Sequence, residues 1–231
     1  MRPIPDVREP EVYRDHDFTG SELVKLESDD LIDVCMQYPI LGMDNAENEC
    51  FVRKEVKKLL IKAAHNLPKG YRFRMLDAWR PFALQQELYE NYSTDIIRQF
   101  SLEDKSEEER NAIIRNFVSE PVFDRDLPPV HTTGGAVDIT ILDPDGRELE
   151  MGSGFDEFSH RTYTSFYEQS SDDEKIRDNR RFLYSIMTDA GFTNLPSEWW
   201  HYDYGDRFWA YYMKKPAIYK GVFTRDDFSS L

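Results

Sequence analysis

Two short segments of this sequence together carry the side chains that a hydrolytic zinc site requires. HTTGGAVD contains His131 and Asp138, and EWWH contains Glu198 and His201. A catalytic zinc ion usually takes three protein ligands and leaves a fourth tetrahedral position for water. His131, Asp138 and His201 are therefore the candidate ligands. Because bound zinc lowers the pKa of its water to about 7, a carboxylate that does not ligate the metal can accept the proton, and Glu198 is the candidate general base.

Backbone preferences indicate how His131 and Asp138 could meet. Residues 136–142, AVDITIL, alternate in the manner of a strand, so Asp138 points away from the apolar face formed by the valine and the isoleucines. The pair Gly134–Gly135 permits positive φ or a close backbone approach. A bend there would place His131 over the strand beside Asp138.

The second segment requires a bend of its own. Glu198 and His201 are three positions apart, which would put them on opposite faces of a straight strand. We therefore expect a bend or bulge near Trp199 and Trp200. Both tryptophans are expected in the core or in a pocket wall, with or without a metal.

Each segment alone also has a purely structural explanation. A buried histidine is more often a hydrogen-bonded core residue than a ligand, an aspartate in a strand can be an edge charge that discourages aggregation, and EWWH can be an aromatic core strand. The remaining histidines, His16, His65 and His160, lack comparable neighbours in the sequence. A metal site is favoured because the two segments together fill every role that a zinc hydrolase needs.

These residues, in this order, resemble the D-alanyl-D-alanine dipeptidases, a zinc peptidase family related to bacterial D,D-carboxypeptidases. The family pattern is Ser-x-His-x-x-Gly-x-Ala-x-Asp followed by Glu-x-Trp-His; residues 129–138 read PVHTTGGAVD and residues 198–201 read EWWH. Further matches are DAWRP at 77–81 and MGSGFD at 151–156. The resemblance covers roughly residues 30–205 in the same order, which makes it more specific than a single motif.

The resemblance implies one zinc ion per chain and hydrolysis of a short D,D-dipeptide, D-alanyl-D-alanine, a building block of the cell wall. Arg80 matches the arginine that stabilises the oxyanion; taken alone it would read as a surface charge after a strand. Asp156 matches the carboxylate that binds the free amino terminus, and Tyr38 is the nearest candidate for a tyrosine of that pocket. Pro129 stands where the family has serine, so a hydroxyl that could contact the substrate is missing.

Two other functions stay open at this point. One is a D,D-carboxypeptidase or L,D-endopeptidase that acts on longer peptidoglycan stem peptides, which an open groove around Asp156 would favour. The other is a zinc-stabilised binding module without catalysis. The presence of Glu198 and Arg80 counts against that module, because a structural site needs neither a spare base nor an oxyanion donor.

Composition limits the partners and the location. The chain has 29 Lys and Arg against 44 Asp and Glu, a net charge of -15, so nucleic acid and anionic membranes are poor partners. The resemblance implies a small peptide as the partner. The sequence shows no transmembrane run and no apolar core of a signal peptide, which predicts a cytoplasmic protein. Cys35 and Cys50 are too few for a disulfide framework and are expected as reduced thiols. The sequence does not indicate an oligomeric state.

The order of elements predicts a single α+β domain, with a small, mainly antiparallel sheet, helices packed on one side and the zinc site on the other. The segregation of the helices is implied in part by the resemblance. Residues 1–30 are expected as an extended N-terminal arm and residues 31–231 as the zinc dipeptidase domain. Periodicity and turn residues predict helices at 49–65, 81–100 and 171–191, strands at 71–79 and 136–142, and a turn at 143–146. Arg80 would lie where strand 71–79 ends.

Overall fold

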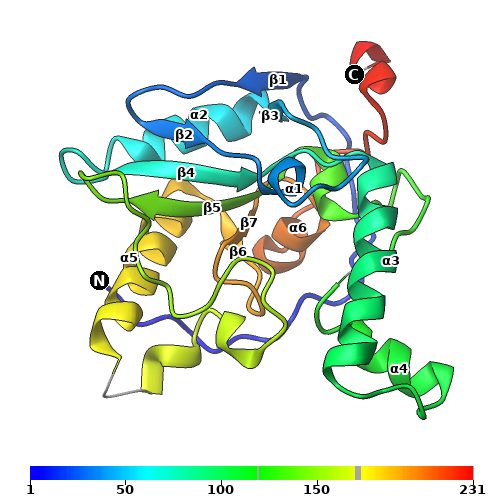
Figure 1. Ribbon diagram of the computed structural model, residues 1–231. Coiled ribbons are helices and arrows are strands. Elements are labelled where there is room, and N and C mark those ends of the chain that lie inside the picture. The colour runs from blue at the N-terminus through cyan, green and yellow to red at the C-terminus, as the bar shows by residue number, and fades with distance from the viewer. Residues whose placement is uncertain (119, 170–172, 231) are drawn as a thin grey trace.

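A five-stranded sheet forms the centre of the computed structural model, which describes residues 1–118, 120–169 and 173–230 (Figure 1). The strands in spatial order are β2 (Ile32–Val34), β4 (Arg72–Asp77), β5 (Ala136–Leu142), β7 (His201–Asp203) and β6 (Thr193–Asn194). The pair β2–β4 is parallel and the other neighbours are antiparallel. A separate antiparallel pair joins β1 (Leu23–Leu26) to β3 (Cys50–Arg53). The predicted α+β fold with a mainly antiparallel sheet is confirmed.

Helices lie on both faces and at one end of this sheet (Figure 1). Their bounds are α1 (Gln37–Ile40), α2 (Lys54–Ala64), α3 (Phe82–Gln99), α4 (Glu107–Ile114), α5 (Glu174–Ala190) and α6 (Arg207–Met213). Shorter 3-10 turns are η1 (Val130–Thr133), η2 (His160–Thr162), η3 (Phe166–Gln169) and η4 (Arg225–Ser230). Within the described residues, every helix is too short or too polar to span a lipid bilayer.

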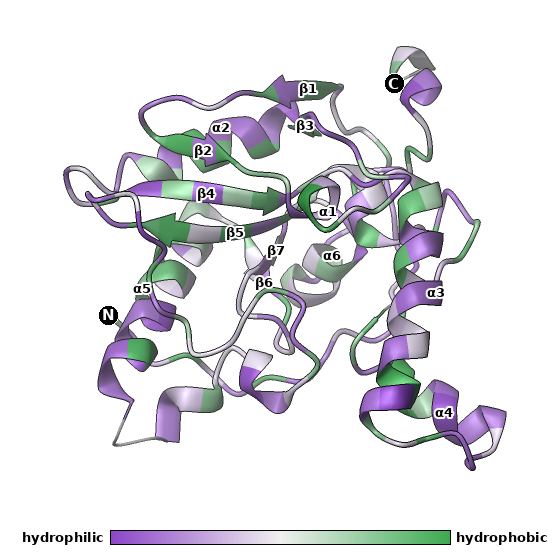
Figure 2. Ribbon diagram, in the orientation of Figure 1, coloured by the Kyte–Doolittle hydropathy of each residue, from purple (hydrophilic) through white to green (hydrophobic). Residues whose placement is uncertain are grey.

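One face of β5 carries the main hydrophobic core. Val137, Ile139 and Ile141 are fully buried in one cluster with side chains of α2 and α5, and burial of each contributes roughly 1.5–3 kcal/mol. Figure 2 shows the hydrophobic residues of β2 and β5 in green. Asp138 lies between these positions in sequence, so it points to the opposite face, as the alternation predicts.

The opposite face of the sheet is covered as well. Phe208 of α6 packs on Ala136 of β5, and Leu84 and Leu88 of α3 pack on Tyr38 of α1. All of β5 is consequently buried. Helices α2 and α5 occupy the side where helices were expected. Helix α6 packs on the other side, and α3 stands at the end of the sheet, where its Leu88 and Tyr92 line a cavity. The candidate site therefore lies inside the domain and not on an open sheet face.

Several predicted elements are present with small shifts of their ends. Strand 71–79 corresponds to β4, helix 81–100 to α3, and strand 136–142 to β5. The turn at 143–146 is closed by the N–H of Gly146, which donates to the Asp143 carbonyl at 2.9 Å. Gly191, with a φ of 114°, ends α5 in the left-handed conformation. Ser171 and Asp172, the start of the expected helix 171–191, lie outside the described residues.

Pairing between β1 and β3 accounts for the two larger differences. The helix expected at 49–65 begins only at Lys54, because Cys50–Arg53 pair with Leu23–Leu26 as a strand. For the same reason the stretch 1–30, expected as an extended arm, ends in a strand pair. Residues 1–22 run along the outside of the domain (Figure 1). The backbone of His16 there forms a bridge with Ala217.

Candidate active site

Strand pairing and one tight turn bring the three candidate ligands together. Asp138 of β5 lies opposite His201 of β7 in the sheet register. His131 lies in η1, and Gly134, with a φ of 72°, turns the chain from η1 into β5. Its positive φ favours glycine, and a Cβ atom here would also displace the end of the Leu23 side chain. The bend predicted at this position is present.

The ligand atoms form a triangle of the size that a tetrahedral metal needs. His131 Nε2 is 3.1 Å from His201 Nδ1 and 3.4 Å from Asp138 Oδ1, and the remaining side, from His201 Nδ1 to Asp138 Oδ1, is 3.1 Å. Zinc–ligand bonds of about 2.0–2.1 Å at tetrahedral angles place neighbouring ligand atoms about 3.3 Å apart. These three residues also form the metal-competent cluster found among the described residues.

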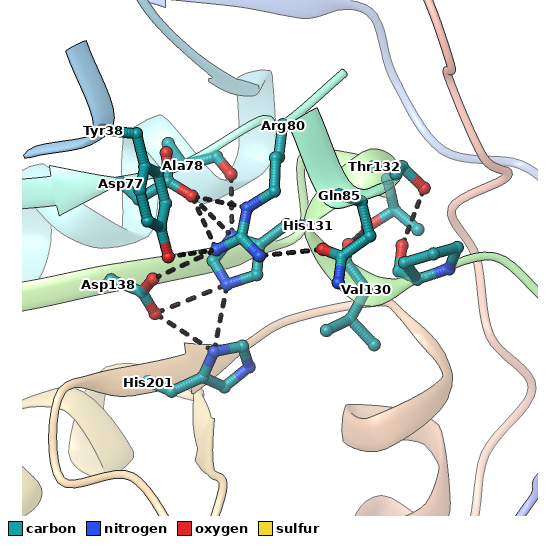
Figure 3. A network of polar contacts seen from close by, with 12 residues as sticks. Tyr38, Asp77, Ala78, Arg80, Gln85, Val130, His131, Thr132, Asp138 and His201 are labelled. Atoms are coloured by element: carbon teal, nitrogen blue, oxygen red, sulfur yellow. Dashed lines mark hydrogen bonds and ion pairs between the residues drawn. The ribbon is translucent and has the colours of Figure 1, made fainter. Parts of the chain in front are cut away.

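Each imidazole is oriented through its other ring nitrogen. His131 Nδ1–H donates to the carbonyl oxygen of Ala78 at 2.8 Å, and His201 Nε2–H donates to Asp203 Oδ1 at 2.8 Å. These partners fix the tautomers, because carbonyl and carboxylate oxygens accept hydrogen bonds. Both remaining nitrogens then direct lone pairs at one another (Figure 3). Such a pair repels unless a proton or a cation lies between them, so the arrangement fits a metal.

The charges around the triangle fit a cation as well. Burial opposes the charging of His201, but the carboxylates of Asp203 and Asp138 outweigh it and raise the pKa of His201 well above its usual value. Burial likewise opposes the ionisation of Asp138, but His131 and His201 hold its pKa far below the usual range. The site thus retains an ionised carboxylate beside an imidazole that a metal would have to deprotonate.

Glu198 lies beside the triangle without belonging to it. The His201 N–H donates to the Glu198 carbonyl at 3.3 Å, so residues 198–201 form a turn and β7 begins only at His201. The expected bend at the tryptophans is therefore present, as a turn. Glu198 Oε2 is 3.7 Å from His201 Nδ1, and its side chain is 27 % exposed toward the cavity. Burial raises the pKa of this carboxyl to about 8.

A chain of polar contacts joins Arg80 to Asp156. Arg80 lies just after β4, and its Nη2 donates to the Tyr38 hydroxyl at 3.1 Å. The Tyr38 hydroxyl in turn donates to Asp156 Oδ2 at 2.9 Å. Tyr92 of α3 donates to the same oxygen at 2.7 Å. Burial raises the pKa of Asp156 to about 6, although the two hydroxyls favour its ionised form.

The guanidinium of Arg80 is buried and is oriented by hydrogen bonds to two neighbouring side chains. Its Nε donates to Asp77 Oδ2 at 3.0 Å, and its Nη1 donates to Gln85 Oε1 at 2.8 Å. Nη2 is 3.7 Å from Asp138 Oδ2, which brings the guanidinium next to a candidate ligand. Figure 3 shows the group pointing from the end of β4 toward the imidazoles. Its surroundings contradict the alternative of a surface charge, since the residue is 7 % exposed.

One cavity unites all seven residues singled out from the sequence. Its empty space is about 530 Å³ when the open solvent at its mouth is included. Its polar lining includes the three candidate ligands with Glu198, Arg80, Asp156 and Tyr38. Pro129 also lines it, together with the apolar side chains of Val118, Val130, Leu195 and Phe208.

Sequence reasoning missed four residues that either line this cavity or bind a side chain that does. Asp203 follows His201 by two positions on the same strand, which was a usable signal for a partner on the same face. Asp77 likewise stands three residues before Arg80. Tyr92 and Gln85 lie on α3, and only the placement of that helix against the sheet brings them to the site.

Comparisons with known proteins agree with this geometry. The profile of a peptidase family described as D-ala-D-ala dipeptidase matches residues 39–218. A D-alanyl-D-alanine dipeptidase from Synechocystis is 31 % identical over 159 residues, which cover 63 % of this chain and 64 % of that protein, so the match spans less than two thirds of the relative. A dipeptidase of the same name from Escherichia coli is 42 % identical over 73 residues, 32 % of this chain and 36 % of that protein.

Solved structures give a more distant likeness. A vancomycin resistance D,D-pentapeptidase, VanY, in complex with Zn(II) has 15 % sequence identity and a TM-score of 0.41, with 75 % of this chain and 85 % of that chain covered. A second VanY structure, in complex with D-alanine-D-alanine, has 16 % identity and a TM-score of 0.35, with 75 % and 84 % covered.

Proposed function

Because this chain belongs to the D-ala-D-ala dipeptidase family of peptidases, we propose that it is a zinc metallopeptidase that hydrolyses the peptide bond of a short D,D-dipeptide, D-alanyl-D-alanine. The observation that carries the proposal is the triangle of His131, Asp138 and His201 with a carboxylate beside it that does not ligate. A purely structural zinc site is closed by protein ligands and has no use for such a group. The cytoplasmic location remains a prediction from the sequence.

In this proposal the metal would act as the Lewis acid. One zinc ion held by His131, Asp138 and His201 would polarise the scissile carbonyl and lower the pKa of water to about 7. Glu198 accepts the proton of the attacking water and returns it to the departing amine. A dication nearby lowers the raised pKa of Glu198 by Coulombic attraction. The carboxyl is then ionised at neutral pH, as a base must be.

Arg80 is proposed to stabilise the oxyanion. Its guanidinium stays charged at any relevant pH, and Asp77 and Gln85 fix its orientation before substrate arrives. A donor that is already oriented costs no reorganisation when charge develops on the carbonyl oxygen. The Nη2 atom beside Asp138 places this positive charge next to the metal position.

Asp156 is proposed to bind the free amino group of the dipeptide. It lies in the same cavity as the ligands, and both tyrosine hydroxyls bind its Oδ2 atom. Tyr38 joins this carboxylate to Arg80, so the group that holds the amine and the group that stabilises the oxyanion are kept in fixed relation. An anchored amine favours a short substrate over the interior of a long stem peptide.

An amine-release assay tests the proposal. The zinc-loaded protein is offered D-Ala-D-Ala, L-Ala-D-Glu and longer stem peptides that end in D-Ala-D-Ala. We expect turnover of the first and little of the others. Cleavage of only the longer peptides would instead support the carboxypeptidase or endopeptidase alternative. Absence of turnover with stoichiometric zinc would support a binding module. Pro129 makes the comparison necessary, because it offers no hydroxyl to the cavity.

A further inference from the structure

A buried arginine outside the cavity binds the loop that carries Asp156. Arg180 of α5 is 1 % exposed. Its Nε donates to the carbonyl of Met151 at 2.7 Å, its Nη1 to that of Tyr163 at 2.5 Å, and its Nη2 to that of Arg161 at 2.6 Å. One guanidinium therefore fixes both ends of the segment 151–163.

The same segment binds the turn that carries Glu198. Trp199 Nε1 donates to Ser153 Oγ at 2.9 Å, and the Trp199 N–H donates to the Thr162 carbonyl at 3.0 Å. The Arg180 guanidinium lies 5.9 Å from the centre of the Trp199 ring. Since Trp199 directly follows Glu198, the loop and the turn form one hydrogen-bonded unit around Arg180.

The hydrogen-bond acceptors described for Arg180 are all uncharged groups. Among the described residues, the groups that accept hydrogen bonds from Arg180 are backbone carbonyls and the Ser153 hydroxyl, with no carboxylate. Burial lowers the pKa of Arg180 to about 10, which leaves it charged at neutral pH. A buried charge is costly unless its donors are satisfied. Displacement of the loop would unpair it, so the loop is held in one conformation.

The backbone conformation of Asp156 requires a loop that is held in place. Its φ is 55°, a left-handed conformation that is uncommon for residues other than glycine. Conformations of this kind persist where the surrounding structure over-determines them. The carbonyls that Arg180 binds lie on both sides of Asp156 in the chain, which is the arrangement that can hold it.

We propose that Arg180 is a positioning residue that sets the spacing between Asp156 and Glu198, and that it thereby makes hydrolysis depend on a free amino group one residue from the scissile bond. The inference rests on the proposed function, because it assumes that Asp156 binds the amine and Glu198 acts at the peptide bond. Arg180 itself touches neither substrate nor metal and acts through the backbone of the loop.

The test compares two substrates within each protein. D-Ala-D-Ala has the free amine, and N-acetyl-D-Ala-D-Ala lacks it. The wild-type protein should prefer the first, and Arg180→Lys should reduce that ratio of kcat/KM by about tenfold or more, because a displacement of about 1 Å can cost on the order of a hundredfold. A merely structural role would lower both rates by one factor. An unchanged ratio in the variant, or no preference in the wild type, overturns the proposal.

Arg53 provides the matched control. It is also 1 % exposed, and its Nε donates to the carbonyl of Thr133 at 2.6 Å, beside the His131 turn. Arg53→Lys should lower zinc content and both rates but leave the substrate ratio unchanged. A ratio that falls equally in both variants would overturn the specific role of Arg180.

A milder variant tests the proposal if Arg180→Lys does not fold. Ser153→Ala removes the acceptor of the Trp199 indole and the weakest acceptor of Arg180, and it leaves the three backbone carbonyls that bind Arg180. It should reduce the same ratio, and an unchanged ratio overturns the proposal. Failure of the proposed function looks different, because the wild-type protein would then not hydrolyse D-Ala-D-Ala at all.

Discussion

Replacement of Asp203 by asparagine isolates the charge that supports one candidate ligand. Asp203 is fully buried, and its Oδ1 accepts the His201 Nε2–H at 2.8 Å. Asparagine keeps an acceptor in the same place and removes the negative charge. The buried Asp206 carboxyl lies against Asp203, and burial together with the Asp203 charge raises its pKa well above the usual value, so an amide nitrogen in place of Asp203 Oδ2 can donate a hydrogen bond to it. We therefore expect Asp203→Asn to fold and to bind zinc more weakly.

Two opposing effects decide the magnitude. The charge attracts the metal, but it also raises the pKa of His201 and so favours the proton that competes for Nδ1. With an effective dielectric constant of about 20, a unit charge about 7 Å from a dication contributes about 5 kcal/mol, against about 3 kcal/mol for a proton about 5 Å away. The metal wins by about 1–2 kcal/mol, so the zinc dissociation constant should rise about tenfold, within the range found for partners of metal-bound histidines.

Competition with a chelator of known affinity measures this dissociation constant at neutral pH. Calorimetry in buffers of different ionisation enthalpy gives the protons released on zinc binding, which should be fewer for Asp203→Asn because its His201 is less protonated beforehand. The reasoning is refuted if the folded variant binds zinc as tightly as the wild type. It is also refuted if zinc binding becomes tighter, which would mean that the proton effect dominates.

Three further predictions concern the reaction and its pH dependence. Glu198→Gln should lower kcat by about 10²–10⁴-fold while zinc content stays near one per chain; turnover near the wild-type level would refute its role as base. His201→Ala should lower zinc content together with activity, and metal analysis showing unchanged stoichiometry would refute the ligand assignment. Because burial raises the pKa of Asp156 to about 6, KM for the dipeptide should rise as pH falls through about 6. Tyr92→Phe removes a donor that favours the ionised carboxylate, so this limb should move to higher pH; a shift to lower pH in the KM profile would contradict the assignment.

Local sequence was sufficient for much of the site. The alternation of residues 136–142 predicts β5 and the direction of Asp138, and the glycine pair predicts the turn that brings His131 back over it. These features depend on backbone preferences within a few residues, which do not change with the rest of the fold. The end of β4 before Arg80 followed from the same kind of signal.

Pairing between distant segments could not be predicted from local sequence. Residues Cys50–Arg53 continue a helical hydrophobic pattern, yet they form β3 because β1 offers them a partner. The placement of α3 and α6 around the site has a similar origin, since it depends on how these helices pack on α1 and on the sheet. No local pattern indicates which of two faces a distant helix will cover.

The sequence by itself determined which side chains could hold a metal and act as a base, together with the local turns that aim them. Only the tertiary structure decided that Asp138 lies opposite His201, that Tyr92 reaches Asp156, and that Arg180 joins the loop to the turn. The physical reason is the distance along the chain over which each effect acts. Turn and strand preferences act over neighbouring residues, whereas register, burial on both faces of β5 and the satisfaction of a buried guanidinium depend on groups far apart in the chain.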